Sequence, residues 1–375
     1  MPSPTHYRLL NTGRALPLVC GAAALLCACG LARPAPSPAD PLPSTTTEAG
    51  IDTSPTFLPP QSALGAIRTR FDVPGAAVAT LRNCELEGVT ISGMASLTPP
   101  RPVTAGTRFE AASLSKPVFA HLVLQLADEG VIDLDAPFAS ASLAPRVADT
   151  DALAALTPRM VLTHRTGLPN WSGDSADPSR TTPLAFEAEP GTQFSYSGEA
   201  FEILRVHVEN ITGMSLESLF RIRLGDLMPH SSFASLPELD ARSRGYASGS
   251  EPWTARDLTA GRNPAAGGLV TTASDYAAFL SAVCKGQRLS PATQTDMLRP
   301  QSAAPIGDYP APTSWGLGWS LMDMGAETII AHGGNNGEFR SFAAFVKETG
   351  EGYVILTNAE TGQDMIRAFM EATGS

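Results

Sequence analysis

Charged residues are scarce in this sequence, and lysine in particular. Only 17% of the 375 residues are charged, and lysine occurs at Lys116, Lys285 and Lys347 alone. A net charge of −11 argues against a protein that binds nucleic-acid phosphates, and the lack of an apolar run of about 18 residues argues against a polytopic membrane protein. A hydrophobic content of 43% is too high for a disordered chain. A soluble body with a large core is expected, in which any chemically active lysine is one of these three.

The N-terminus has the layout of an export signal. Arg8 and Arg14 precede an apolar stretch at 15–28 that is too short to span a membrane. The residues Leu-Cys-Ala-Cys-Gly at 26–30 resemble the lipobox of bacterial lipoproteins. Residues 1–28 are therefore predicted to be a signal peptide and Cys29 the lipidated residue, with plain secretion as the alternative. The protein would be exported and anchored to a membrane of the cell envelope, with its domain in the periplasm or outside the cell.

Two further features concern the chain after the signal. Residues 33–60 contain 8 prolines, so residues 29–60 are predicted to form a semi-extended, Pro-rich tether. Cys84 and Cys284 could pair in an oxidising compartment, but they lie far apart and no tight spacing supports a bond. We therefore favour two separate buried thiols.

Strand-like segments lie near both ends of the predicted domain, residues 61–375. Strands are expected at 75–81, 89–93, 328–331, 342–346 and 353–357, and helices at 61–70, 117–129, 158–163, 199–210, 216–223, 274–285 and 364–372. If the terminal strands pair, the fold class is α/β (α+β), with one antiparallel sheet flanked by helices and an inserted all-α domain. The α/β part would cover about 61–115 and 310–375 and the helical part about 116–309, with a substrate cleft between them.

The tetrad Ser113-x-x-Lys116 stands directly before an apolar helix. A spacing of three places the hydroxyl and the amine on one helical face, and Pro117 belongs in a first turn. Ser113 is therefore expected at a helix start, where free amides and the helix dipole favour negative charge. Burial would lower the pKa of Lys116 toward that of a base able to take the proton of Ser113. Serine is common, so this tetrad alone is a weak signal.

Other segments, in order, make the pattern specific. The segment around Ser113 and those at 162–169, 194–198, 267–275 and 332–334 together resemble the serine β-lactamase and penicillin-binding protein superfamily. The branch they resemble holds class C β-lactamases, D-alanyl-D-alanine peptidases and family VIII esterases. The resemblance covers about residues 61–375 and implies the β-lactamase/transpeptidase-like fold.

The resemblance also implies roles for individual residues. Ser113 resembles the acylated nucleophile and Lys116 its general base, and Tyr196 resembles the phenol that relays the proton, its high pKa lowered by the charge of Lys116. The oxyanion hole would be the backbone amides of Ser113 and Asn335. Gly333 and Gly334 would let substrate approach the strand edge.

Two residues depart from the family's pattern. Gly198 stands where many members have an asparagine that binds a substrate amide, and His332 replaces a lysine that helps to hold a substrate carboxylate. A histidine is mostly neutral at pH 7, so both changes favour esterase or peptidase chemistry over strong β-lactamase activity. Arg340 could restore a positive charge nearby, although we favour a surface arginine.

Other chemical sites find little support. The acidic pair Asp133 and Asp135 is interpreted as a solvated turn, His121 as a core residue, and His164 as a loop hydrogen-bonding residue. No zinc pattern or Gly-x-Ser-x-Gly motif occurs, and no metal or cofactor is expected.

The sequence thus predicts an envelope serine hydrolase that cleaves a small ester, amide or peptide substrate through an acyl-enzyme on Ser113. Peptidoglycan-derived compounds and β-lactams are the candidate substrates. The alternatives are a D-alanyl-D-alanine carboxypeptidase or a class C-like β-lactamase. A lipoprotein that binds or senses a ligand without turnover is the alternative from another class.

Overall fold

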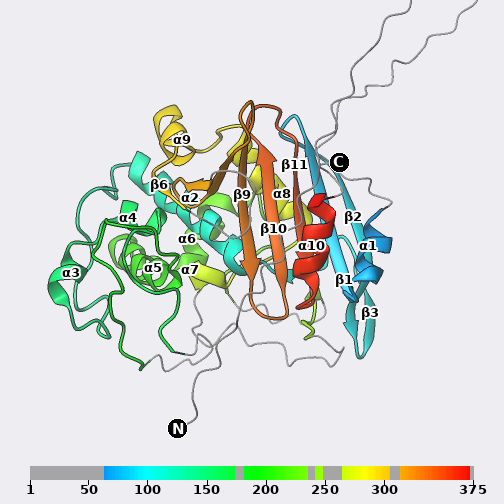
Figure 1. The fold of residues 1–375 in the computed structure, drawn as a ribbon, viewed down its shortest axis with the longest axis horizontal. Coiled ribbons are helices and arrows are strands. Elements are labelled where there is room, and N and C mark those ends of the chain that lie inside the picture. The colour runs from blue at the N-terminus through cyan, green and yellow to red at the C-terminus, as the bar shows by residue number, and fades with distance from the viewer. Residues whose placement is uncertain (1–62, 174–180, 235–240, 248–263, 305–312, 372–375) are drawn as a thin grey trace, which may run out of the picture. The chain divides into compact units, whose positions relative to one another are not determined.

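The computed structural model describes residues 63–173, 181–234, 241–247, 264–304 and 313–371. The predicted signal peptide, Cys29 and the Pro-rich tether lie outside these ranges. The described chain contains a nine-stranded antiparallel sheet, in the order β3-β2-β1-β11-β10-β9-β8-β7-β6 (Figure 1). The strands are β1 (Gly75–Arg82), β2 (Glu85–Leu97), β3 (Pro100–Pro102), β6 (Ser302–Ala303), β7 (Thr313–Trp315), β8 (Ser320–Asp323), β9 (Thr328–Asn335), β10 (Arg340–Val346) and β11 (Gly352–Thr357).

The sheet joins the two ends of the folded chain. β1 pairs with β2 on one side and with β11 on the other, with Val78 opposite Ile355. Alternate residues of β1 enter two different hydrophobic clusters, Ala76 and Val78 in one and Ala77 and Ala79 in the other, because successive side chains point to opposite faces. The predicted fold class, an antiparallel sheet of terminal strands flanked by helices, is confirmed.

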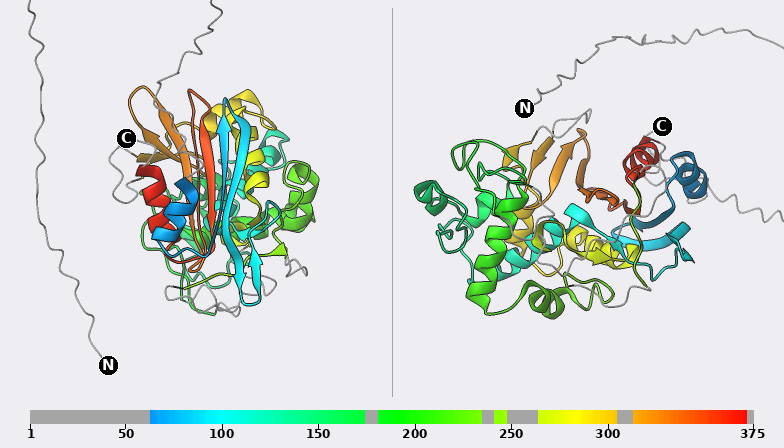
Figure 2. Two further views of the ribbon diagram at one scale, coloured as in Figure 1. Left: turned by 90° about the vertical axis from the view of Figure 1, so that its right-hand side faces the viewer. Right: turned by 90° about the horizontal axis from the view of Figure 1, so that it is seen from below.

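Helices cover both faces of the sheet. Figure 2 shows α1 (Leu64–Arg70) beside α10 (Gly362–Glu371) on one face, and α8 (Ala273–Cys284) packs against β1, β2 and β11 on the other. The remaining helices are α2 (Ser115–Asp128), α3 (Thr150–Ala154), α4 (Pro158–Leu162), α5 (Gly198–Thr212), α6 (Leu216–Leu224), α7 (Pro264–Gly267) and α9 (Pro291–Met297). α8 thus belongs to the sheet packing, although its sequence position falls within the range assigned to the helical part.

The helix that follows the Ser-x-x-Lys tetrad runs through the core. Every residue of α2 from Ser115 to Leu126 is buried, as its apolar sequence predicts. His121, interpreted as a core residue, is 1% exposed and packs edge-on against Phe279. Within the described ranges, no helix is both long enough and apolar enough to cross a bilayer.

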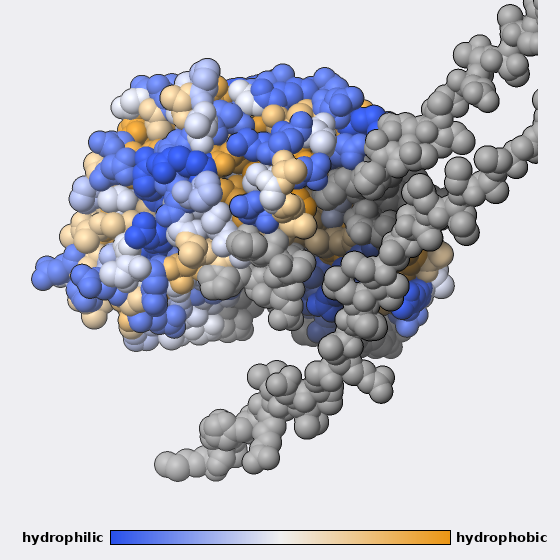
Figure 3. All heavy atoms as spheres, turned by 45° about the horizontal axis from the view of Figure 1, so that its top comes forward, coloured by the Kyte–Doolittle hydropathy of each residue, from blue (hydrophilic) through white to orange (hydrophobic). Residues whose placement is uncertain are grey.

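The face shown in Figure 3 mixes hydrophilic and hydrophobic residues. Among the described residues, the exposed large hydrophobic ones are Leu86, Ile91, Val131, Ile211, Ile222 and Met324. Single apolar residues of this kind are ordinary on a protein surface.

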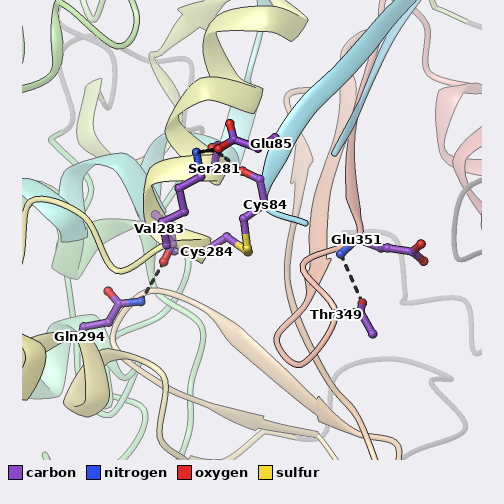
Figure 4. The surroundings of a disulfide bond; sticks show 9 residues. Cys84, Glu85, Ser281, Val283, Cys284, Gln294, Thr349 and Glu351 are labelled. Atoms are coloured by element: carbon purple, nitrogen blue, oxygen red, sulfur yellow. Dashed lines mark hydrogen bonds and ion pairs between the residues drawn. A yellow bond between two sulfur atoms is a disulfide. The ribbon is translucent and has the colours of Figure 1, made fainter. Parts of the chain in front are cut away.

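Cys84 and Cys284 form a disulfide (Figure 4), so the interpretation as separate thiols is wrong. Cys84 lies in the turn between β1 and β2, and Cys284 is the last residue of α8. Their Cα atoms are 5.6 Å apart although 200 residues separate them. The same contact includes a hydrogen bond from the Ser281 hydroxyl to the Cys84 carbonyl (2.5 Å) and an ion pair of Lys285 with Glu85 (2.6 Å). Only the packing of α8 across the first hairpin brings the two cysteines together, and no local spacing shows it.

Candidate active site

Ser113 lies where an irregular segment enters α2. It occupies the short 3-10 helix η2 (Ala112–Leu114), which leads directly into α2, and it is half-buried between fully buried neighbours. Ala112 has a φ of +50°, a conformation that costs a non-glycine residue energy and that the surrounding structure must enforce. Tyr276 of α8 helps to do so, because its hydroxyl donates to the Leu114 carbonyl (2.9 Å).

Lys116 lies beside Ser113 and is fully buried. Its Nζ is 3.2 Å from the Ser113 Oγ and donates to the Ala266 carbonyl of α7 at 2.8 Å. Burial lowers the pKa of Lys116 from 10.5 to about 7, while the charge of Glu202 acts in the opposite direction. The amine is therefore substantially unprotonated near neutral pH and can accept a proton.

Tyr196 completes a cluster with these two residues. Its hydroxyl forms a hydrogen bond with the side chain of Ser113, and the Lys116 Nζ lies 4.8 Å from the centre of its ring. Burial raises the pKa of Tyr196 well above its usual value. The expected lowering of this pKa by Lys116 is wrong, because the loss of hydration outweighs the other influences. Tyr196 is a protonated phenol at neutral pH, which leaves Lys116 as the stronger candidate for the base.

His164 supports Tyr196 from behind. Its ring stacks on the Tyr196 ring with centroids 4.2 Å apart, and its Nδ1 accepts a hydrogen bond from the Ser197 amide (3.0 Å). The prediction that His164 bonds a loop is confirmed. Sequence reasoning missed the stacking, since 32 residues of chain separate the two rings and no pattern links them.

Strand β9 lies against the segment that carries Ser113. A Cβ built on Gly334 would come within 2.6 Å of the Ala111 carbonyl oxygen, so only glycine fits there, whereas Gly333 and Asn335 are exposed. The close approach places the Asn335 end of β9 beside η2. His332 is buried, and burial together with the nearby Lys116 lowers its pKa to about 3. Its ring is therefore neutral at pH 7.

Gly198, the second departure from the family pattern, has a structural explanation. The indole ring of Trp171 covers Gly198 closely enough to exclude a Cβ. Arg340 is only 8% exposed, so the surface interpretation is wrong. Its guanidinium donates to the carbonyls of Gly337 and Phe339, in the turn between β9 and β10.

A buried polar network that sequence reasoning missed lies next to the site. Glu110, three residues before Ser113, forms an ion pair with Arg242 (2.5 Å) and accepts from the Asn336 side chain (3.0 Å). Asn336 also donates to the Gly267 carbonyl (3.0 Å). The network ties β4 (Phe109–Glu110), which pairs with β5 (Val270–Thr271), to the end of β9. In the sequence, its signal is the acidic Glu110 shortly before the Ser-x-x-Lys tetrad.

The acidic pair at 133 and 135 forms a turn. The Asp133 carboxylate accepts from the Asp135 amide (2.9 Å), and Asp135 pairs with Arg159 (2.6 Å). In the part of the chain that the structure describes, no three His, Cys, Asp or Glu side chains are grouped as a metal site would require.

Comparison with known proteins identifies the family. The family model described as Beta-lactamase matches residues 64–372, and the chain therefore belongs to this family of serine hydrolases. Penicillin-binding protein 4 of Amycolatopsis lactamdurans is 28% identical over 327 residues, which cover 80% of this chain and 84% of that protein. Esterase EstB of Burkholderia gladioli is 29% identical over 169 residues, covering 38% and 42%.

A solved structure shows the same fold. The D-amino acid amidase of Ochrobactrum anthropi SV3 superimposes with a TM-score of 0.70 at 23% identity, over 83% of this chain and 96% of that one. The recognition of a β-lactamase-related chain from its ordered motifs is confirmed.

Proposed function

We propose that the protein is an envelope serine hydrolase that cleaves an ester or amide through an acyl-enzyme on Ser113. The observation that carries this proposal is the buried Lys116 amine, 3.2 Å from the Ser113 Oγ and with a pKa near 7. An unprotonated amine in this position can remove the hydroxyl proton as the oxygen attacks a carbonyl carbon.

The proton then has a short route to the leaving group. The Tyr196 hydroxyl, which is hydrogen-bonded to Ser113, would donate its proton to the departing oxygen or nitrogen and receive one from the Lys116 ammonium. In deacylation the route reverses, as water loses a proton to the Lys116–Tyr196 pair and attacks the ester. The Ser113 oxygen leaves and regains its proton.

The charge that develops on the carbonyl oxygen would be held by the amides of Ser113 and Asn335. The tight fit of Gly334 against Ala111 supports this assignment, because it holds β9 beside the segment carrying Ser113. The exposed Gly333 would leave the strand edge open to substrate.

The surroundings favour substrates without a carboxylate next to the scissile bond. His332 is neutral, and the Arg340 guanidinium is engaged with backbone carbonyls, so neither offers a free positive charge. Trp171 occupies the space in which a side chain at position 198 would lie. An esterase- or amidase-like activity fits this site better than strong β-lactamase activity, and the similarity to an esterase and to the fold of an amidase agrees with it.

A location in the cell envelope is part of the proposal. The disulfide between Cys84 and Cys284 supports it, because such bonds persist mainly in oxidising compartments. Export with lipidation of Cys29 would tether the domain to a membrane through residues 29–60.

A penicillin-recognising function is the second candidate, because the match to a penicillin-binding protein spans 80% of this chain. The chain would then be a D-alanyl-D-alanine carboxypeptidase, a class C-like β-lactamase, or a sensor that is acylated without turnover.

Parallel assays of a short nitrophenyl ester, a D-Ala-D-Ala peptide and a chromogenic cephalosporin separate the enzymes. We expect the ester to be turned over fastest. A long-lived cephalosporin adduct in the intact mass, without turnover of any substrate, would favour the sensor.

A further inference from the structure

A buried carboxylate lies behind Lys116, one peptide group away. Glu202 of α5 is 7% exposed, and its Oε1 accepts a hydrogen bond from the Ala266 amide at 2.9 Å. The carbonyl of the same residue, Ala266, accepts the bond from the Lys116 Nζ at 2.8 Å. Ala266 of α7 therefore accepts a hydrogen bond from the Lys116 amine through its carbonyl and donates one to the Glu202 carboxylate through its amide.

We propose that Glu202 is a positioning residue for the base. It fixes the α7 backbone at Ala266, which in turn holds the Lys116 amine beside Ser113, and its negative charge reaches that amine. This inference rests on the proposed role of Lys116. It adds a residue of α5 that does not touch the reacting atoms.

Arg205 holds Glu202 in place. Its Nε donates to the Glu202 Oε2 at 2.7 Å, and its Nη1 donates to Glu209. Because the Ala266 amide donates to the Glu202 Oε1, the two Glu202 oxygens have separate partners. Arg205 and Glu202 line a cavity of about 250 Å³ that also contains the ion pair of Arg146 with Glu199. The Glu202 carboxylate thus lies between a buried amine and a partly solvated ion-pair network.

The other groups facing Lys116 cannot take the place of Glu202. Tyr196 is protonated, and the two histidines, His164 and His332, have pKa values far below neutrality because burial disfavours their charged forms. Both would repel the amine if charged. Glu202 therefore supplies the negative charge that acts on Lys116.

The low lysine count allows a direct test by NMR. Full-length protein with ¹³Cε-labelled lysine gives three side-chain signals, and Lys285→Arg and Lys347→Arg assign the other two. For Glu202→Gln, whose amide oxygen can still accept from Ala266, we expect the Lys116 titration midpoint to fall by about half a pH unit or more.

Glu209→Gln is the matched control, since Glu209 also pairs with Arg205 but has no bond to Ala266. It should leave the Lys116 midpoint within about 0.2 pH units of wild type. Equal midpoints in Glu202→Gln and Glu209→Gln would overturn the proposal.

Kinetics separate positioning from charge. Glu202→Ala leaves the Ala266 amide without its acceptor, so we expect acylation of Ser113 at high pH to slow about tenfold or more, with less loss in Glu202→Gln. Equal rates in the two variants would contradict the positioning role. Circular dichroism checks that each variant is folded.

The positioning role of Glu202 and the acyl-enzyme on Ser113 can be tested independently of each other. Because the titration needs no substrate, it tests Glu202 even if Ser113 is never acylated. An adduct mapped to Ser113 together with an unmoved titration would overturn this inference alone.

Discussion

The indole ring of Trp171 lies on the Cα of Gly198, so that a Cβ at position 198 would come within 2.4 Å of the ring. Gly198 is the first residue of α5 and follows Tyr196 by two positions. Its amide donates to the Asn170 side chain at 3.0 Å, which fixes the chain before Trp171 to the start of the helix. The effects of substituting Gly198 and Trp171 on stability should therefore be coupled.

We expect Gly198→Asn to displace Trp171 and to lower the free energy of unfolding by about 1–3 kcal/mol, the usual cost of overpacking. Urea unfolding followed by fluorescence measures it. Gly213→Asn is the control, because that C-cap glycine has open space around it and a φ of +66° that asparagine tolerates. Adding Trp171→Ala to Gly198→Asn should recover part of the loss. Full additivity of the two changes would contradict the coupling.

Ser113→Ala should abolish hydrolysis of every substrate while changing the melting temperature by only a few degrees. The Ser113 side chain is half-buried, and its hydroxyl would act as the nucleophile rather than as part of the packed core. Ester hydrolysis and thermal unfolding are the measurements. Residual activity near the wild-type level would place the nucleophile elsewhere.

The pH dependence of kcat/KM should report Lys116. Because the unprotonated amine is the active form, kcat/KM for an uncharged ester should rise with pH and level off above about 7, the pKa of Lys116. Below that value the rate should fall about tenfold per pH unit, since the ammonium cannot accept a proton. A profile that falls with increasing pH between 6 and 8 would exclude this base.

Removal of the disulfide should destabilise the protein without abolishing its chemistry. Cys84→Ser with Cys284→Ser opens a link across 200 residues, and we expect a loss of about 2–5 kcal/mol in the free energy of unfolding. Denaturant unfolding with and without reductant measures it, and reduced wild type should match the double variant. Equal stability of the oxidised and reduced protein would be inconsistent with a bond formed in solution.

Cys29→Ser should release the protein from membranes. The reason is that a lipid attached to the Cys29 thiol would be the anchor. Fractionation of expressing cells, with blotting of membrane and soluble pools, checks it. Unchanged membrane association would exclude lipidation at this position.

The sequence allowed most of the local structure and the candidate site to be predicted. Strands β1, β10 and β11 and helices α2, α5, α6 and α8 form close to their expected positions, because period-2 and helical patterns report local burial. The expected strands at 89–93 and 328–331 are shorter than β2 and β9, which contain them. Strands β6, β7 and β8 escaped prediction, since each is only two to four residues long.

The sequence by itself determined the family, through motifs that follow one another in a set order. It also determined that Ser113 and Lys116 meet, because residues three apart lie on the same face of a helix. Tertiary structure decided what those residues can do. The depression of the Lys116 pKa, the stacking of His164 on Tyr196 and the Cys84–Cys284 bond all depend on segments distant in sequence that enclose the site. Burial and contact depend on which segments pack together, and the spacing of residues along the chain does not specify this packing.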